Sequence, residues 1–359
     1  MKIVLLKGIE GFGDRLQCLL QAIGYAKATE RILVVDWRDS HWTHDQSLEF
    51  EHYFHIEGLK TLSFCDFIKE VQAHSAYAGD YLSVVPEAWN NHLVNPDYET
   101  FIRDPDYALP GNGGCLERII EGNEPDFENP IVVYPGIGQR TFKYRNALHL
   151  RPTQIISEAL KACVDEHNLS SFQYDIIHLR GGTKRWVGGS ISEESPNYEK
   201  HIQWESAHRY MQEIFDVLQQ LRQGSMPCPL YILTDTPSLA KQWIRYFGEA
   251  TLISNSAHGL MGDTGIHKIR KQSLSNANMP ESTTGDSRPI TKELLNVEAI
   301  RDFILMNNAR HLVGDGISIF SYLAYGLKSN NVILANLPAR HSTPQASQHG
   351  ANSHTRWRF

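Results

Sequence analysis

Short apolar runs recur along the chain, and each ends abruptly in a polar residue or a glycine. The runs cover residues 2–8, 31–37, 130–136, 174–182, 230–235, 250–254, 310–316 and 331–337. Their hydrophobicity is continuous rather than alternating, which is typical of strands covered on both faces, as in a parallel sheet. Between them, apolar residues recur at helical spacing in 14–28, 205–222 and 293–309. Alternation of strands and helices predicts an open α/β architecture.

The length of 359 residues predicts two domains. Three runs lie in the first half and five in the second, so we expect a boundary within 150–172. The predicted organisation is an N-terminal Rossmann-like domain over 1–160, a second such domain over 161–337, and a polar tail over 338–359. Residues 271–291 are rich in Ser, Asn, Thr and Gly, and predict a long loop.

Composition and charge narrow the class of partner. Apolar residues make up 41% of the chain, and the net charge is −7 without a run of like charges. This argues against nucleic acid or a lipid surface as the main partner. The five cysteines form no CxxC motif, which favours reduced thiols. No uncharged apolar stretch approaches about 18 residues, so we expect no stable membrane insertion and a cytoplasmic location.

Ligands of open parallel sheets bind beyond the carboxyl ends of the strands. The residues at the ends of the runs are therefore the candidates: Gly8 to Asp14, Asp36, Gly136 to Gly138, His178 to Lys184, Asp235 with Thr236, and Asp315 to Ser318. Two glycine-containing loops and one Arg/Lys loop that converge on one place predict a phosphate-binding site.

The first of these loops, residues 8–15, leads directly into a helix. Gly11 and Gly13 would let backbone N–H groups approach a phosphate at the helix N-terminus. One alternative is a dinucleotide site with Asp36 at the end of the next strand, although the spacing is GxxGxG rather than GxGxxG. Another is a tight turn without a ligand. The loop alone does not separate these three interpretations.

The second loop, residues 178–185, is more informative. Arg180 ends a buried strand, where a charge is costly unless it meets an anion. Its planar guanidinium suits bidentate contact with phosphate. Two glycines then turn the chain so that Lys184 can reach the same centre. The alternative is a salt bridge from Arg180 to a carboxylate across the domain boundary.

The third loop, residues 314–321, precedes the helix SYLAYGL. Gly316, Ser318 and the backbone around them would form an anion-binding nest at a helix start. The alternative is N-capping by one of the serines.

No metal motif is convincing. Asp104-Pro-Asp106 contains a proline and follows no apolar strand, and the pairs His41/His44 and His52/His55 lack a third ligand nearby. HExxH, GxSxG and P-loop motifs do not occur in the sequence. We therefore expect no obligatory metal and no cofactor.

A family resemblance adds to this picture. GFGDRLQCLLQAIGYAKATERILVVDW resembles the opening of the rhizobial nodulation fucosyltransferases and, more distantly, of the eukaryotic α1,6-fucosyltransferases. YDIIHLRGGTK, YILTDTPSLAKQW, TGIHK and DFILMNNARHLVGDGISIFSYLAYGL resemble further segments of that family in the same order. The resemblance implies a GT-B fold, in which two Rossmann-like domains face each other across a cleft. The donor would bind mainly to the C-terminal domain and the acceptor mainly to the N-terminal one.

The resemblance also implies roles for single residues. Arg180 matches the arginine that holds the donor β-phosphate, Lys184 a lysine near the pyrophosphate, and Ser318 a serine that contacts phosphate. His178 and Asp302 match residues around the guanine, Asp235 matches an acidic residue at a strand end, and His267 lies in the TGIHK turn. The chain departs from the family at Gly181, Thr183 and Gly188, which stand where the eukaryotic type has an arginine, an aspartate and the proposed base. Glu194, or its neighbour Glu193, is the nearest replacement for that base.

The function implied is an inverting, metal-independent transfer of fucose from GDP-fucose to a hydroxyl of a glycan acceptor. Two alternatives stay open. One is a GT-B enzyme that uses another nucleotide sugar, and the other is a non-catalytic nucleotide-sugar-binding protein. Trp37, Trp42 and Tyr53 either stack on acceptor sugars or are ordinary core or surface aromatics.

Overall fold

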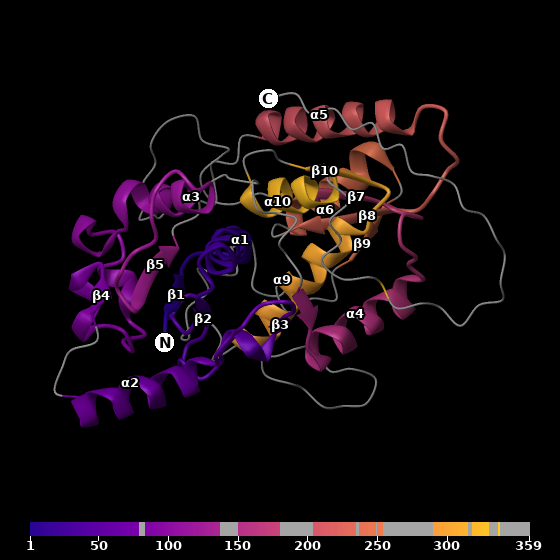
Figure 1. The fold of residues 1–359 in the computed structure, drawn as a ribbon. Coiled ribbons are helices and arrows are strands. Elements are labelled where there is room, and N and C mark those ends of the chain that lie inside the picture. Colours follow the sequence, from indigo (N-terminus) through magenta and orange to yellow (C-terminus); the bar gives the residue numbers. More distant parts are fainter. Residues whose placement is uncertain are drawn as a thin grey trace. The chain divides into compact units, whose positions relative to one another are not determined.

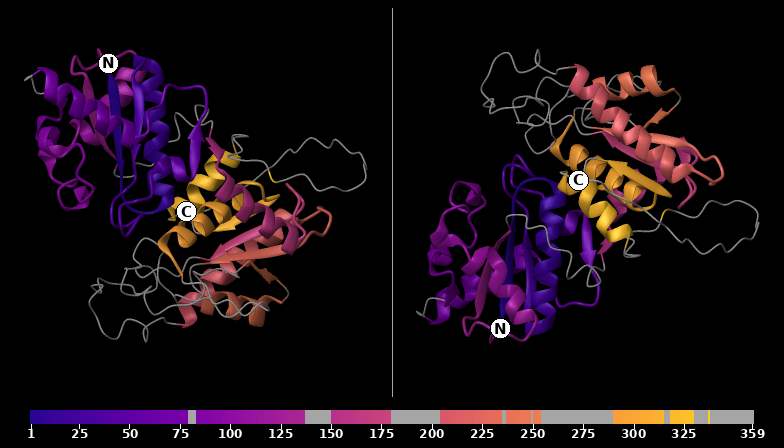
Figure 2. Two further views of the ribbon diagram at one scale, coloured as in Figure 1. Left: turned by 90° about the horizontal axis from the view of Figure 1, so that it is seen from below. Right: turned by 90° about the horizontal axis from the view of Figure 1, so that it is seen from above.

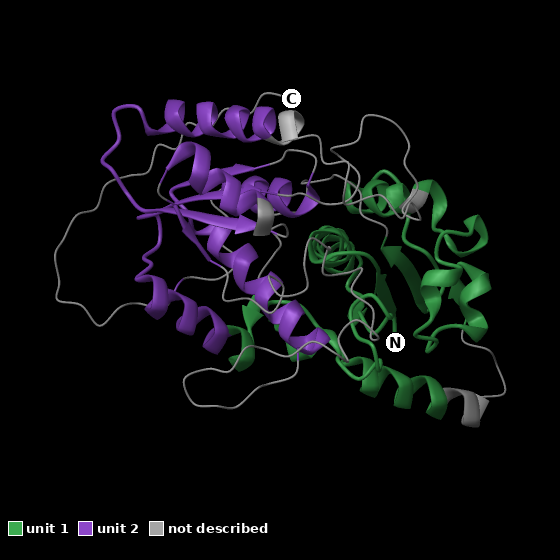
Figure 3. Cartoon of the chain, turned by 180° about the vertical axis from the view of Figure 1, so that it is seen from behind, with its two compact units in different colours: residues 1–156 green, residues 157–359 purple. Residues whose placement is uncertain are grey.

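The computed structural model describes residues 1–78, 83–136, 150–179, 204–234, 237–248, 250–253, 290–314, 318–329 and 337. The chain divides into two compact units, unit 1 over 1–156 and unit 2 over 157–359 (Figure 3). The boundary expected from the sequence, between 160 and 161, falls inside helix α4 (Gln154–His167). Among the described residues, no helix is both long enough and apolar enough to span a bilayer.

Unit 1 contains a parallel sheet with the strand order β2-β1-β5-β4 (Figure 1). Its strands are β1 (Ile3–Gly8), β2 (Ile32–Asp36), β4 (Val84–Val85) and β5 (Ile131–Gly136). The three strands predicted in this half are confirmed. Every residue of β1 and of β5 is buried, which accounts for their continuous hydrophobicity.

Helices cover both faces of this sheet. Helix α1 (Phe12–Thr29) packs on β1, with α3 (Gly114–Ile120) beside it. On the other face, Phe64 and Phe67 of α2 (Phe64–Ala78) join Ile3 and Leu5 in one hydrophobic core. The connections carry the short 3₁₀ turns η1 (Phe50–His52), η2 (Glu87–Asn91), η3 (Tyr98–Thr100), η4 (Pro105–Tyr107) and η5 (Pro110–Gly113).

A small antiparallel pair, not predicted from the sequence, lies in the same unit. Strand β3 (Phe54–Ile56) pairs with β6 (Leu150–Pro152). The outer edge of β2 is covered too, because the Leu33 N–H donates to the Lys60 carbonyl (3.0 Å) and the Leu62 N–H donates to the Leu33 carbonyl (3.1 Å).

Unit 2 contains a second parallel sheet, with the order β10-β7-β8-β9. Its strands are β7 (Asp175–Leu179), β8 (Leu230–Thr234), β9 (Thr251–Leu252) and β10 (His311–Gly314). Four of the five strands predicted in this half are confirmed. The fifth, 331–337, lies outside the described residues except for Leu337.

Helices lie on both faces of this second sheet as well. One face shares a core with α5 (Trp204–Arg222) and α6 (Pro237–Phe247). Helices α9 (Lys292–Asn307) and α10 (Ile319–Lys328) pack together on the opposite side (Figure 2). The predicted helices 14–28, 205–222 and 293–309 are therefore confirmed as α1, α5 and α9.

The two strand orders locate the expected ligand sites. In the described sheet of unit 1, β1 lies between β2 and β5, and in that of unit 2, β7 lies between β8 and β10. Both arrangements occur in doubly wound α/β proteins. The direction of winding reverses between β1 and β5 in unit 1 and between β7 and β10 in unit 2. Ligands of such folds bind at the carboxyl ends of this strand pair.

Candidate functional site

The reversal point of unit 2 brings His178 and Gly314 together. These residues are directly opposite each other in the pairing of β7 with β10. A Cβ atom on Gly314 would lie 3.2 Å from Ser321 Oγ and 3.3 Å from the Cβ of His178. The glycine therefore permits the close approach in which His178 Nδ1 and Ser321 Oγ form a short hydrogen bond. The ring of Phe320 packs 5.6 Å from the imidazole and helps to fix its orientation.

Ser318 is the residue best placed to meet an anion. It is the N-cap of α10 and only 4% exposed, yet its side chain makes no capping hydrogen bond. Among the described residues its Oγ has no hydrogen-bond partner. Buried hydroxyls are normally hydrogen-bonded, and a helix N-terminus favours negative charge. Within the described part of the chain, the Ser318 hydroxyl thus makes none of the hydrogen bonds that N-capping by this serine would require.

Asp302 lies on α9, the helix that packs against α10. Its Oδ1 accepts hydrogen bonds from Arg301 Nε (2.8 Å) and Nη2 (2.7 Å). Burial alone would lower the pKa of Arg301, but the Asp302 carboxylate raises it. The next residue, Phe303, contacts Phe320 with ring centroids 5.3 Å apart. Asp302 thus pairs with Arg301, and the rings of Phe303 and Phe320 extend from its neighbourhood on α9 toward His178.

A hydrogen bond joins the ends of β7 and β8, next to two other predicted site residues, Arg180 and Asp235. Thr234 Oγ1 donates to the Leu179 carbonyl at 2.5 Å, one residue before Arg180 and one before Asp235. Six of the predicted residues lie outside the described residues and stay predictions: Arg180, Lys184, Glu194, Asp235, His267 and Gly316.

The reversal point of unit 1 is occupied by the chain's own cation. Arg15 is fully buried and donates to the Gly8 carbonyl (2.7 Å), the Glu10 carbonyl (2.9 Å) and Asp39 Oδ2 (2.6 Å). The left-handed backbone of this loop is at Glu10, with φ of 66°. A phosphate would need N–H groups at this place, whereas two carbonyls here converge on a guanidinium. The loop is therefore best explained as a tight βα turn.

The glycines of this loop have different surroundings. Gly11 is the N-cap of α1 in an extended conformation, and Gly13 is buried in the first turn. Their predicted contact with the donor stays a prediction. Gly8 is required for packing, because a Cβ there would lie 2.7 Å from Trp37 Nε1.

The dinucleotide interpretation is contradicted at Asp36. This carboxylate is fully buried and accepts hydrogen bonds from Lys7 Nζ (2.8 Å) and Arg38 Nε (3.1 Å). Burial would raise the pKa of Asp36, but the two cations hold it below its usual value. A dinucleotide fold needs this acidic side chain to accept hydrogen bonds from ribose hydroxyls. Here it is inaccessible and already paired.

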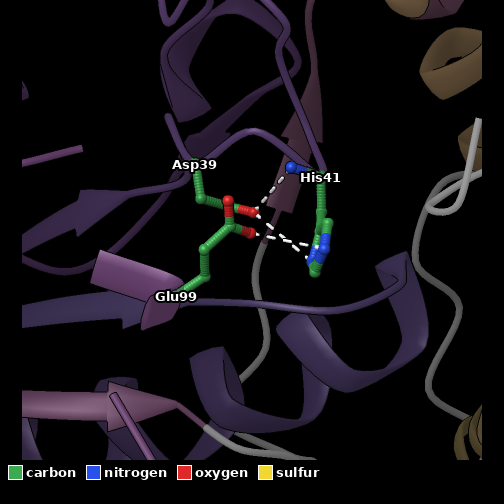
Figure 4. Close-up of side chains that lie close together, drawn as sticks. All are labelled: Asp39, His41 and Glu99. Carbon is green, nitrogen blue, oxygen red and sulfur yellow. Dashed lines mark hydrogen bonds and ion pairs between the residues drawn. The ribbon is translucent and has the colours of Figure 1, made fainter. Parts of the chain in front are cut away.

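A cluster of Asp39, His41 and Glu99 was not found from the sequence (Figure 4). Among the described residues it is a group of three side chains that could hold a metal ion, with candidate ligand atoms within 4.8 Å of one another. His41 Nε2 lies 3.3 Å from Glu99 Oε2, and the His41 backbone N–H donates to Asp39 Oδ1 at 3.1 Å. Arg15 already binds the other Asp39 oxygen. Both Asp39 oxygens are thus satisfied within the protein, and we assign no metal to this cluster.

The aromatic residues considered for acceptor stacking belong to the core. Trp37, Trp42 and Tyr53 are between 0% and 2% exposed. Their ring centroids lie 5.5 Å apart for Trp37 and Trp42 and 5.6 Å apart for Trp42 and Tyr53. None of the three rings can stack on a sugar in this conformation.

The chain is similar to known proteins both in sequence and in fold. No family model matches. Nodulation protein Z of Bradyrhizobium diazoefficiens is 24% identical over 242 residues, which cover 65% of this chain and 59% of that protein. A crystal structure of the NodZ α-1,6-fucosyltransferase soaked with GDP-fucose superposes with a TM-score of 0.58 at 17% identity, over 91% of this chain and 92% of that one. The chain shares the fold of NodZ.

A second solved structure is more distant. POFUT1 in complex with GDP has a TM-score of 0.50 at 13% identity, over 92% of this chain and 96% of that one. The expected α/β fold of the GT-B type, with two Rossmann-like units, is confirmed by the two parallel sheets and by these similarities. The resemblance to the nodulation fucosyltransferases is confirmed as well.

Proposed function

We propose that the protein is a glycosyltransferase that transfers fucose from GDP-fucose to a hydroxyl group of a glycan. The observation that carries this proposal is the reversal point of unit 2. There the Ser318 hydroxyl, which has no hydrogen-bond partner among the described residues, lies at the N-terminus of α10, the helix whose Ser321 contacts His178. This is the arrangement expected for a nucleotide diphosphate in a doubly wound unit. Crystals of NodZ, whose fold the chain shares, have been soaked with GDP-fucose, and NodZ has been co-crystallised with GDP.

The proposed reaction inverts the anomeric carbon and needs no metal. The acceptor oxygen attacks that carbon while its bond to the β-phosphate oxygen breaks, and GDP leaves with the bonding electrons. Arg180, Lys184 and the N-terminus of α10 would stabilise the negative charge that grows on the pyrophosphate. The acceptor proton goes to a carboxylate, for which Glu194 is the candidate. We also propose a cytoplasmic location, which the five free thiols support.

The test is calorimetric titration of EDTA-treated protein with GDP, UDP, ADP and NAD. We expect selective GDP binding that does not need a metal. Ser318→Ala should weaken it about 10- to 100-fold, because hydrogen bonds to charged groups contribute about 1.5–3 kcal/mol. Ser329→Ala, at the other end of the same helix, is the matched control and should leave the affinity unchanged. Asp302→Ala should weaken GDP binding far more than UDP binding.

Other outcomes separate the alternatives. Selective UDP binding would keep the fold and exclude fucose. Donor binding without GDP release, across a broad panel of glycans, would indicate the non-catalytic alternative. Failure to bind any nucleotide would contradict the proposal as a whole.

A further inference from the structure

Unit 1 contains a pocket that no predicted site residue lines. Its volume is about 250 Å³, and it lies along the edge strand β2 beneath η1 and the β3–β6 pair. Leu33, Val35, Phe50 and Phe54 form its apolar wall. A space of this size holds several water molecules and admits one small ring.

The pocket contains one polar group without a partner. Glu51 lines it, and Glu51 Oε2 is buried without a hydrogen-bond partner among the described residues. Burial raises the pKa of Glu51 to about 7, so near neutral pH the carboxyl is protonated for part of the time. A buried carboxyl oxygen without a partner is unfavourable. A ligand hydroxyl could satisfy it in either protonation state, since a hydroxyl both donates and accepts.

The charges around the pocket select against ionic ligands. The polar residues of its lining besides Glu51 are His55, Thr61 and Arg151, and Arg151 pairs with Glu57 outside the pocket at 3.2 Å. An anionic ligand would be repelled by the ionised form of Glu51. A cationic ligand would meet Arg151 and would lose its hydration against the apolar wall. A neutral ring with apolar faces and hydroxyl groups at its edge avoids both penalties.

We propose that this pocket binds one neutral pyranose residue, with Glu51 hydrogen-bonded to a ring hydroxyl. That the bound sugar belongs to the acceptor glycan rests on the proposed function, whereas sugar binding itself does not. The pocket is built entirely within unit 1, while His178, Asp302 and Ser318 belong to unit 2. The acceptor would thus have a binding site on a different unit from the donor.

The experiment is saturation-transfer NMR on the full-length protein without nucleotide. The probes are the methyl glycosides of glucose, galactose, mannose and N-acetylglucosamine, with glucuronate and glucosamine as charged counterparts. We expect saturation of the ring protons of at least one neutral glycoside, with a Kd at least tenfold lower than for either charged sugar.

Four variants locate the bound sugar. Thr61→Trp puts a large side chain at an exposed residue of the lining, and Glu51→Leu removes the carboxyl, so each should lose binding at least tenfold. Glu51→Gln keeps a hydrogen-bonding group and should stay within a few-fold of the natural protein. Glu70→Gln changes an exposed carboxylate on α2, outside the pocket lining, and is the matched control, with unchanged binding.

The outcomes separate this proposal from the proposed function. Absence of sugar binding in a preparation that binds GDP would overturn the pocket and leave the nucleotide site intact. Binding that survives in Thr61→Trp, or that prefers glucuronate or glucosamine, would also overturn it. Binding that is lost in Thr61→Trp and Glu51→Leu would support the pocket, even if the protein bound no GDP.

Discussion

Lys7 and Asp36 form a fully buried ion pair, with 2.8 Å between Nζ and Oδ2, at the carboxyl ends of the neighbouring strands β1 and β2. Three aromatic rings surround the ammonium group, and the closest, Tyr98, has its centroid 4.4 Å from Nζ. Removal of either partner leaves a charge buried in this apolar surrounding. Single substitutions of Lys7 or Asp36 should therefore lower the stability of unit 1, although neither residue belongs to the proposed nucleotide site.

The first prediction concerns this pair. Lys7→Met and Asp36→Asn should each destabilise unit 1 by about 3–5 kcal/mol, because each leaves the other charge without its main partner. Urea unfolding followed by tryptophan fluorescence measures the change. Lys69→Met, which breaks an exposed ion pair with Asp66, is the control and should leave the unfolding midpoint unchanged. Equal midpoints for all three variants would contradict the prediction.

The second prediction concerns Glu51 and pH. Its pKa is about 7 in the folded protein, where Glu49, Asp36 and Asp66 add to the effect of burial, against 4.5 as the ordinary value. The folded state thus binds the proton more tightly, so this contribution to stability is fully present below pH 4.5 and is lost as pH rises through about 7. The loss amounts to at most about 3 kcal/mol.

Glu51→Gln removes this titration. The difference in free energy of unfolding between the variant and the natural protein should therefore shift in favour of the variant as pH rises from about 5 to about 8. Denaturant unfolding at roughly half-unit steps of pH measures this difference. A constant difference between Glu51→Gln and the natural protein over this range would show that Glu51 titrates normally.

The third prediction uses two glycines in equivalent places. A Cβ on Gly136, at the end of β5, would lie 2.8 Å from the Cβ of Cys18, whereas one on Gly314 would lie 3.3 Å from the Cβ of His178. Gly136→Ala should destabilise unit 1 by about 1–3 kcal/mol through overpacking, with GDP affinity unchanged. Gly314→Ala should displace His178 and Ser321 and weaken GDP binding. Titration of both folded variants with GDP decides between these outcomes.

The fourth prediction concerns Asp175, at the opposite end of β7 from His178. It is buried and accepts hydrogen bonds from Arg222 (2.6 Å) and Arg310 (3.0 Å). Burial would raise the pKa of Asp175, but these two arginines lower it below 3.8. The stabilisation is therefore present above pH 3.8 and is lost as pH falls through the lower folded pKa.

Asp175→Asn tests this directly. It should cost about 3 kcal/mol at pH 7, because it leaves two guanidinium groups without their carboxylate. The difference from the natural protein should shrink at acidic pH, since Asp175 itself then becomes protonated. A cost that stays constant down to pH 2 would contradict the assignment.

The sequence predicted the two sheets because their strands are buried on both faces and therefore read as unbroken apolar runs, as in β1 and β7. It did not predict β3 and β6, because each has three residues and their pairing joins segments about a hundred positions apart. Ser318 was found because it lies in a strand–loop–helix unit, where chain order gives the position. Glu99 beside His41, and Glu51 beside Arg151, come together only through tertiary packing, which the spacing of residues does not encode.

Trp37 shows that burial, too, is difficult to predict from sequence. Its position at the end of a strand was compatible with an acceptor platform, yet Gly8, Phe50 and Trp42 enclose it completely. Burial of a large aromatic side chain depends on what packs around it, and those neighbours come from several separate segments of the chain.

The segment from Lys60 to Leu62 covers the outer edge of β2, where the backbone of Leu33 hydrogen-bonds to Lys60 and to Leu62. An uncovered parallel edge strand of such hydrophobicity would invite a strand from another molecule to add to the sheet. Thr61, in the middle of this protective segment, also lines the pocket of unit 1. If the pocket binds a sugar as proposed, the ligand would contact the segment that covers this edge, and a bound glycoside should slow aggregation of the concentrated protein.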